Sequence, residues 1–263
     1  MLTRRFLDSP IGQLHAREGR GEGTLLLMLH AAPGSALMLT PLQERLTVPT
    51  LAMDLPGMGD SAPLPASSVE ATIADFAAPI RAALEVSQYD VYGTLSGARV
   101  ALELAATDPR VRRVILDGIG IPKPDDLDEL LDRYAPPFAP HINGTHLTDT
   151  FLLCRDQYLF YPWYARDAEH RRPTGLPSAE QLHIKTMEAL KSATAFRPLI
   201  RAAFRYDVAT ALKTLKQPAL ISADGAAVRA DLPTLTEPPM EPLTAPADNL
   251  DKRAAAIHAF LLA

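Results

Sequence analysis

The stretch Tyr89–Pro109, YDVYGTLSGARVALELAATDP, contains the pattern on which the fold prediction rests. It begins with a short apolar run, passes through a turn bounded by Gly93 and Gly97, and ends in a segment with apolar residues at helical spacing. A strand, a tight turn and a helix in this order often present a reactive side chain at the edge of a sheet. The residue midway between the two glycines is Leu95, so the sequence sets the question of what chemistry this turn supports.

The composition favours one α/β domain with an insertion. The 263 residues are 47% hydrophobic, which is enough to bury a large core. The net charge is −5 and no Lys/Arg cluster is present, so neither nucleic acid nor a membrane is expected as a partner. The longest apolar run, LLLML, is too short to span a bilayer, and the N-terminus lacks the apolar core of a signal peptide. A single cysteine, Cys154, fits a reducing compartment, and we expect a cytoplasmic location.

Short apolar strands alternate with helices through residues 1–121. Leu25–Leu29 is the clearest strand, because a run that is apolar on both faces and closed by Pro and Gly suits the centre of a parallel sheet. The alternation predicts right-handed βαβ crossovers and a doubly wound, mostly parallel sheet. The other expected elements are a paired strand segment over 5–20, a strand ending at Asp54, a helix over 69–85 kinked at Pro79, the strand and helix of the opening stretch, and a strand ending at Asp117.

The alternation stops at Pro122 and resumes after residue 207. Between them the sequence has only helical patterns and proline-rich links, and Ser178 with Gln181 forms a capping box for one helix. We therefore predict a core formed by residues 1–121 and 208–263, and a helical insertion formed by residues 122–207. The last expected elements are an apolar strand ending near Asp224, a weak edge strand within 231–247, and a helix capped by Asp248.

Four segments resemble the α/β-hydrolase superfamily in their order and spacing. They are LHAAPGS (29–35), MDLPGMGDS (53–61), YGTLSGA (92–98) and DPRVRRVILDG (108–118). The resemblance is close over residues 5–121 and loose over 208–263. It implies an α/β-hydrolase fold, a doubly wound and mostly parallel sheet in which residues 122–207 are a helical cap inserted after the sixth strand.

A competing pattern is GMGDSA, which matches a dinucleotide fingerprint at Gly57, Gly59 and Ala62. That fingerprint must open a helix, so that the pyrophosphate meets the helix N-terminus. Here the pattern runs into SAPLPASS, which is not a first helical turn, and we reject a dinucleotide site.

The resemblance places Leu95 at the nucleophile position, because the superfamily's turn is Gly-x-nucleophile-x-Gly. Leucine cannot attack a substrate. Ser96 is one residue out of register, and we interpret it as a helix-start residue. A serine esterase that uses a shifted Ser96 stays the third hypothesis.

The rest of a Ser-His-Asp triad is also incomplete. The superfamily places its acid after the sixth or seventh strand, where Asp117 and Asp224 stand, although each equally suits a loop or turn role. Its histidine belongs in the loop before the last helix, and MEPLTAPADNLD (240–251) has none. His258 falls within that helix, off its apolar stripe. We therefore predict that the triad mechanism has no residues to use.

An oxyanion hole survives in the resemblance, because its donors are backbone N–H groups, expected here at Ser96 and Ala32. His30, in the HAAPG loop, either orients that loop or faces the pocket. The insertion adds aromatic and polar groups around NGTHLTDTFLLCRDQYLFYPWYARD (143–167), which either bury the cap on the core or line a substrate pocket. The predicted pocket residues are Leu95, Arg155, Gln157, Tyr158 and Trp163.

The candidate acid–base residues are Asp117, His146, His30 and Asp224, with His141 and His183 as further cap histidines. No two histidines have ligand spacing on a helix, so we expect neither a metal nor another cofactor.

The first functional hypothesis is an enzyme that acts on a small, carbonyl-containing molecule by non-covalent acid–base chemistry. The reaction classes are lyase, decarboxylase, isomerase, cyclase and water-activating hydrolase. The alternative is a pseudo-hydrolase that binds a small ligand without turnover. The expected partner is thus a small molecule, and a homodimer is left open.

Overall fold

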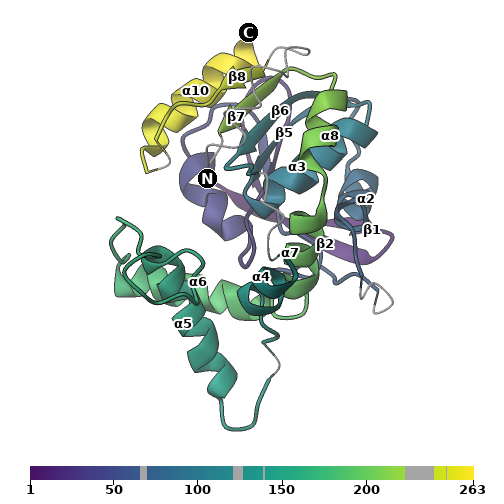
Figure 1. Cartoon of the computed structure of the whole chain (residues 1–263). Coiled ribbons are helices and arrows are strands. Elements are labelled where there is room, and N and C mark those ends of the chain that lie inside the picture. The colour runs from purple at the N-terminus through teal and green to yellow at the C-terminus, as the bar shows by residue number, and fades with distance from the viewer. Residues whose placement is uncertain (66–69, 121–126, 139, 223–239, 247) are drawn as a thin grey trace.

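The computed structural model describes residues 1–65, 70–120, 127–138, 140–222, 240–246 and 248–263. Within them, eight strands form one sheet in the order β1-β2-β4-β3-β5-β6-β7-β8 (Figure 1). The strand β2 is antiparallel to both of its neighbours, and every other adjacent pair is parallel. The strands are β1 (Thr3–Ser9), β2 (Gly12–Gly19), β3 (Leu26–Leu29), β4 (Thr50–Met53), β5 (Tyr89–Thr94), β6 (Val111–Asp117), β7 (Ala219–Ser222) and β8 (Met240–Pro242). The predicted mostly parallel sheet is confirmed.

Helices cover both faces of this sheet, which explains its continuous apolar strands. In β3, Leu26 and Met28 belong to one buried cluster, whereas Leu27 and Leu29 belong to the other, because successive side chains point to opposite faces. Each such buried side chain stabilises the fold by about 1.5–3 kcal/mol relative to an exposed one. One face carries η1 (Ala36–Leu39), α1 (Thr40–Gln43) and α10 (Leu250–Leu262), and the other carries α2 (Ile73–Ala83), α3 (Ser96–Thr107) and α8 (Val208–Thr214).

Capping confirms one predicted helix start and corrects another. The side chains of Ser178 and Gln181 form the expected capping box of α6 (Ala179–Lys191). The cap of α10 is Asn249 rather than Asp248, because the Asn249 side chain accepts a hydrogen bond from the Lys252 N–H. The end of the strand predicted near Asp224 lies outside the described residues, and β7 is described to Ser222.

Between β6 and β7 the described residues contain only helices, apart from one isolated bridge. They are α4 (Leu127–Tyr134), α5 (Thr145–Leu159), α6, α7 (Phe196–Arg205) and α8. The first three, with their links (residues 127–191), are called the cap below, and they form the lower body in Figure 1. The exact boundary of the insertion, residues 122–207, stays a prediction.

The helix α7 joins the cap to the core. Its Phe196 and Ile200 pack into the cap's own apolar cluster, whereas Leu199 and Ala203 pack into the core cluster under α2 and α3. The cap is therefore held against the carboxyl ends of the central strands. Among the helices of the described residues, none is long and apolar enough to cross a membrane.

Candidate functional site

The turn after β5 holds Leu95 in a strained conformation. Its φ is 50° and its ψ is −111°, and it is the one non-glycine residue with positive φ in the described part of the chain. A residue with a Cβ needs about 1–3 kcal/mol to stay in such a region. A Cβ on Gly93 would collide with the carbonyl oxygen of Gly97, and one on Gly97 would lie 2.5 Å from the carbonyl oxygen of His30. The two glycines therefore allow α3 to start against the sheet with only the middle side chain free.

Three strand ends meet around Leu95. In the ladder, Leu29 pairs with Gly93 and Thr94 pairs with Asp117, so the loops after β3, β5 and β6 lie at one edge. The Leu95 N–H donates to the Asp117 carbonyl (2.8 Å). The buried Arg99 guanidinium donates to the Leu95 carbonyl (3.0 Å), and burial lowers its pKa to about 10. The turn is thus fixed on both sides.

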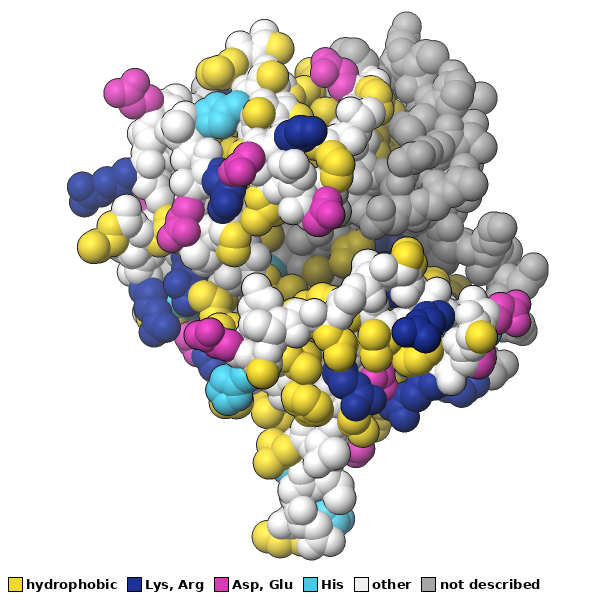
Figure 2. All heavy atoms as spheres, turned by 90° about the vertical axis from the view of Figure 1, so that its left-hand side faces the viewer, with side chains coloured by type: hydrophobic (Ala, Val, Ile, Leu, Met, Phe, Trp, Pro, Cys, Tyr) yellow, Lys and Arg dark blue, Asp and Glu magenta, His cyan; other side chains and the backbone are white. Residues whose placement is uncertain are grey.

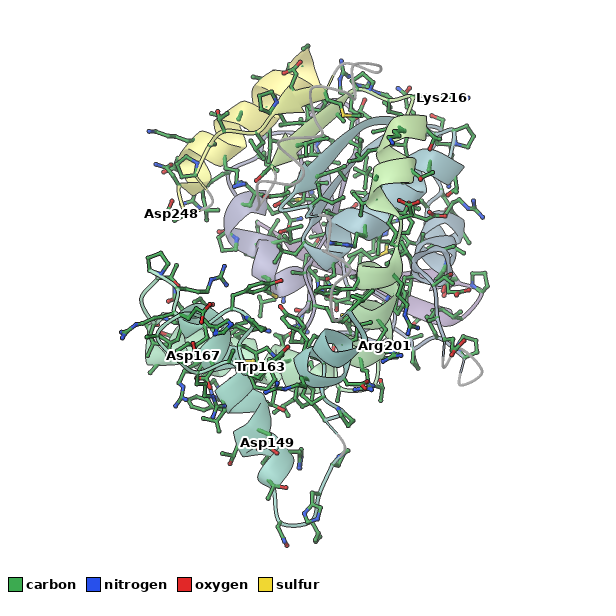
Figure 3. All side chains as sticks on the ribbon, in the orientation of Figure 1. Asp149, Trp163, Asp167, Arg201, Lys216 and Asp248 are labelled. Atoms are coloured by element: carbon green, nitrogen blue, oxygen red, sulfur yellow. The ribbon has the colours of Figure 1, made fainter. Side chains whose placement is uncertain are left out.

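A cavity of about 200 Å³ lies between this edge and the cap. Figure 2 shows this face hollowed between core and cap, with hydrophobic side chains inside the hollow. The described residues that line the cavity are Ala31, Ala32, Pro33, Met38, Leu95, Tyr134, Gln157, Tyr158, Phe160, Tyr161, Trp163, Arg172, Thr174 and Lys185. Figure 3 labels Trp163 on the part of the cap that faces the core.

Of the five predicted pocket residues, Leu95, Gln157, Tyr158 and Trp163 are among those that line this cavity. Arg155 is not, because its Nε donates to Asp156 (2.7 Å), a fully buried carboxylate inside the cap.

The sequence reasoning missed Lys185, Arg172 and Tyr134. Lys185 projects from α6, and Arg172 comes from the irregular link before it. No local pattern marks either one, because only the docking of the cap brings them to the cavity. Burial raises the pKa of Tyr134 to about 12, so its hydroxyl stays protonated at neutral pH.

The two predicted oxyanion donors differ in their present partners. The Ser96 N–H, at the first position of α3, has no protein acceptor among the described residues. The Ala32 N–H instead donates to the Ser96 hydroxyl (2.8 Å), and Ser96 is only 5% exposed. One donor is therefore open and the other is occupied by the neighbouring side chain.

Asp117 is engaged in a buried ion pair. Its Oδ1 accepts from Arg253 of α10 (2.7 Å), and its Oδ2 accepts from the Tyr92 hydroxyl (2.7 Å). Burial is the largest cause that raises the pKa of Tyr92 well above its ordinary value, followed by the nearby Asp117 charge. We assign Asp117 the role of fixing α10 to the sheet.

The predicted histidines lie away from the cavity lining. His30 is fully buried, its Nδ1 lies 2.9 Å from the Ala31 carbonyl oxygen, and its Nε2 accepts from the Leu55 N–H (3.0 Å). Burial lowers the pKa of His30, so the neutral form with the proton on Nδ1 fits these contacts. His146 accepts from the His141 N–H (3.0 Å) near the start of α5. Figure 3 places Asp149, three residues further along, well away from the core. Neither His30 nor His146 is among the described residues that line the cavity.

His183 is exposed on α6, and the Nε2 of His258 accepts from the Thr47 N–H (2.9 Å). The last acid–base candidate, Asp224, lies outside the described residues.

The carboxylate of Asp54 connects the second predicted loop to the rest of the core. It accepts from His15 Nδ1 (2.8 Å), Ala36 N–H (2.6 Å) and Asp60 N–H (2.9 Å). Burial pushes the pKa of Asp54 upward, but these hydrogen bonds and the neighbouring His30 hold it below its ordinary value. We assign this cluster a structural role. The GMGDSA pattern in the same loop opens no helix over the described residues 54–65, as expected.

The comparisons with known proteins agree with this architecture. The sequence matches a family model described as the alpha/beta hydrolase family over residues 26–259. No curated protein sequence gives a significant match.

Solved structures with the same fold are numerous. A putative aryl esterase from Burkholderia cenocepacia is 20% identical with a TM-score of 0.72, covering 99% of this chain and 100% of that chain. A hydrolase from Pseudomonas aeruginosa is 20% identical with a TM-score of 0.71, covering 99% of both chains. An epoxide hydrolase from an endophytic Streptomyces is 19% identical with a TM-score of 0.70, covering 99% of this chain and 95% of that chain. At such identities the similarity shows the fold.

Proposed function

Because the chain belongs to the alpha/beta hydrolase family, we propose that it acts on a small, carbonyl-containing molecule in the core–cap cavity without a Ser-His-Asp triad. The chemistry is non-covalent acid–base catalysis, of the lyase, decarboxylase, isomerase, cyclase or water-activating hydrolase type. The observation that carries this proposal is the strained turn, which presents Leu95 to the cavity where a nucleophile would stand.

The residues at this turn do not favour covalent catalysis, which needs an exposed nucleophile and a base beside it. The neighbouring Ser96 hydroxyl is buried and accepts from the Ala32 N–H, and Ser96 is not among the residues that line the cavity. No histidine occurs anywhere in residues 184–257, which include the loop before the last helix. The buried His30 uses both ring nitrogens in backbone contacts. Neither His30 nor the loop before the last helix therefore supplies Ser96 with a histidine base.

The backbone donor at the turn is suited to polarising a substrate carbonyl. The open Ser96 N–H sits at the positive end of α3 and can donate to an oxygen that gains charge in an enolate or in a tetrahedral species. Proton transfer needs a separate group. Asp224 is our candidate, because it follows β7 in the sequence by two residues, and parallel strands bring their carboxyl ends to one edge.

A second function, ligand binding without turnover, is favoured by a separate observation. The Ala32 N–H is already occupied by Ser96, and Asp117 is paired with Arg253. An oxyanion hole with one free donor stabilises a developing charge less than a complete one does. In this case Leu95 serves only as part of the apolar floor of the cavity.

One set of measurements separates these functions. The purified chain is incubated with small lactones, enol esters and β-keto acids, and product is followed by NMR. Conversion that persists in Ser96→Ala and disappears in Asp224→Asn supports the enzyme. The matched control is Asp149→Asn, an exposed carboxylate on α5, which should leave conversion unchanged. Saturable binding without any product establishes the second function instead.

The third hypothesis is tested in the same preparation. A fluorophosphonate probe labels serines that are activated for attack, and we expect no labelled peptide. A labelled Ser96 peptide, lost in Ser96→Ala, would show a shifted nucleophile and overturn both functions above.

A further inference from the structure

The cap side of the cavity carries two positive charges and no negative one among its described lining residues. The charges are those of Lys185 on α6 and Arg172 on the link before it. The other polar lining groups are neutral, and the chain as a whole has more acidic than basic residues. A wall with only cations is therefore a local feature.

Neither cation is neutralised within the described part of the chain. No carboxylate there lies within 4.0 Å of Lys185 or of Arg172. Four other arginines around the cap do have carboxylate partners: Arg155 and Arg166 both pair with Asp156, and Arg197 and Arg201 both pair with Asp132. Lys185 and Arg172 thus have no carboxylate partner among the described residues.

The contacts that Lys185 and Arg172 do make hold them in place without removing their charge. The Lys185 ammonium lies 4.7 Å from the centre of the Tyr158 ring, and Arg172 donates to the Gln157 carbonyl (3.0 Å). Lys185 is half-buried, and Arg172 is exposed at the mouth of the cavity. Burial is the main cause that lowers the pKa of Lys185; the neighbouring Cys154 opposes this shift, and the charge of Arg172 adds to it. The two cations therefore repel each other, and an anion between them would relieve both effects.

The cavity also has a size and an aromatic lining that suit one ring. An apolar cavity of about 150 Å³ accepts benzene, and this one measures about 200 Å³. Five aromatic residues are among those that line it: Tyr134, Tyr158, Phe160, Tyr161 and Trp163.

We propose that the core–cap cavity binds a small aromatic carboxylate, whose carboxyl group pairs with Lys185 and Arg172 and whose ring packs among the cap aromatics toward Leu95. Planar carboxylates match the donor geometry of a guanidinium, and the lysine adds a second charge. The inference rests on the proposed function in that it takes this cavity as the ligand site, and it names the substrate class.

Isothermal titration with benzoate and with benzamide, which has nearly the same shape and no charge, tests the inference. Benzoate should bind at least about tenfold more tightly, because hydrogen bonds to charged groups are stronger than those between neutral groups. Lys185→Gln and Arg172→Gln should each weaken benzoate binding by about tenfold and leave benzamide binding unchanged. Raising the salt concentration should weaken benzoate binding alone.

Two matched variants control for loss of charge in general. Arg171→Gln changes the exposed residue next to Arg172, and Lys216→Gln changes an exposed lysine at the far end of the core (Figure 3). Neither residue lines the cavity, and neither change should alter benzoate affinity. If Lys185→Gln fails to fold, Lys185→Met is used instead, because methionine keeps an aliphatic side chain over Tyr158.

Equal affinity for benzoate and benzamide would overturn the inference, as would unchanged benzoate binding in both cavity variants. Absence of binding by either probe at millimolar concentration would also overturn it. These outcomes are separate from the proposed function. If the protein converts a neutral carbonyl compound but does not bind benzoate, only the inference of a carboxylate ligand is overturned. If it binds benzoate but shows no turnover, that inference holds and the proposed catalytic function does not.

Discussion

Replacing Leu95 with glycine and, separately, with alanine isolates the strain in the turn after β5. At φ 50° and ψ −111°, a residue with a Cβ is destabilised by about 1–3 kcal/mol. Both replacements remove the same atoms beyond Cβ, so the lost packing of a side chain that is 47% exposed cancels in the comparison. Glycine loses about 0.5–1 kcal/mol more conformational entropy on folding than alanine does. The glycine variant should therefore be more stable than the alanine variant, by about 1 kcal/mol at the centre of these ranges and by at most about 2.5 kcal/mol.

The free energies of unfolding come from urea titrations followed by circular dichroism, compared at equal m-values. The control is Ala255→Gly, at an exposed position inside α10, where glycine should instead destabilise by about 1 kcal/mol. The opposite signs at the two positions are the result to look for. A Leu95→Gly protein that is no more stable than Leu95→Ala would refute the assignment of strain to this residue.

Three further predictions concern groups around the same edge. Arg253→Met removes the buried cation that donates to Asp117 Oδ1 and should lower the free energy of unfolding by about 3–5 kcal/mol, whereas adding Asp117→Asn, which removes the carboxylate charge and keeps an acceptor for the Tyr92 hydroxyl, should recover part of the loss; equal losses in the two proteins would contradict this. Burial lowers the pKa of His30, so below about pH 6.5 the unfolded chain binds a proton that the folded chain does not, and stability should fall by up to about 1.4 kcal/mol per pH unit. Urea denaturation at a series of pH values should show a smaller dependence of stability on pH in His30→Gln than in the unmodified protein. An unchanged dependence would show that His30 is not its cause. Gly97→Ala forces a Cβ to within 2.5 Å of the His30 carbonyl and should cost about 3 kcal/mol in thermal melts, while Gly175→Ala, with no atom within 4 Å, should be neutral.

The parts of the fold that depend on local sequence were predictable. The apolar run before the HAAPG loop indicated a strand buried on both faces, and β3 is one. The spacing of Gly93 and Gly97 placed Leu95 at the centre of the turn, and its positive φ is the backbone state that such a turn needs. Ser178 and Gln181 marked a helix start because capping requires only neighbouring residues.

The parts that depend on distant residues were not predictable. Arg253 pairs with Asp117 across 136 positions, and the Ser96 hydroxyl accepts from Ala32 across 64. Nothing near Asp117 in the sequence shows that its carboxylate will be neutralised by the last helix. Lys185 was likewise indistinguishable from a solvated lysine, since only the docking of α6 places it over Tyr158.

The geometry of the turn also makes position 95 a natural attachment point. The backbone there is set by the glycines and by α3, so the side chain at this position enters the cavity whatever its identity. A cysteine introduced there would sit at a helix N-terminus, where thiolates are favoured. The one native cysteine, Cys154, is buried, and burial raises its pKa. Disulfide-bearing fragments should therefore couple selectively at residue 95, which turns the vacant nucleophile position into a means of capturing and identifying the molecules that the cavity prefers.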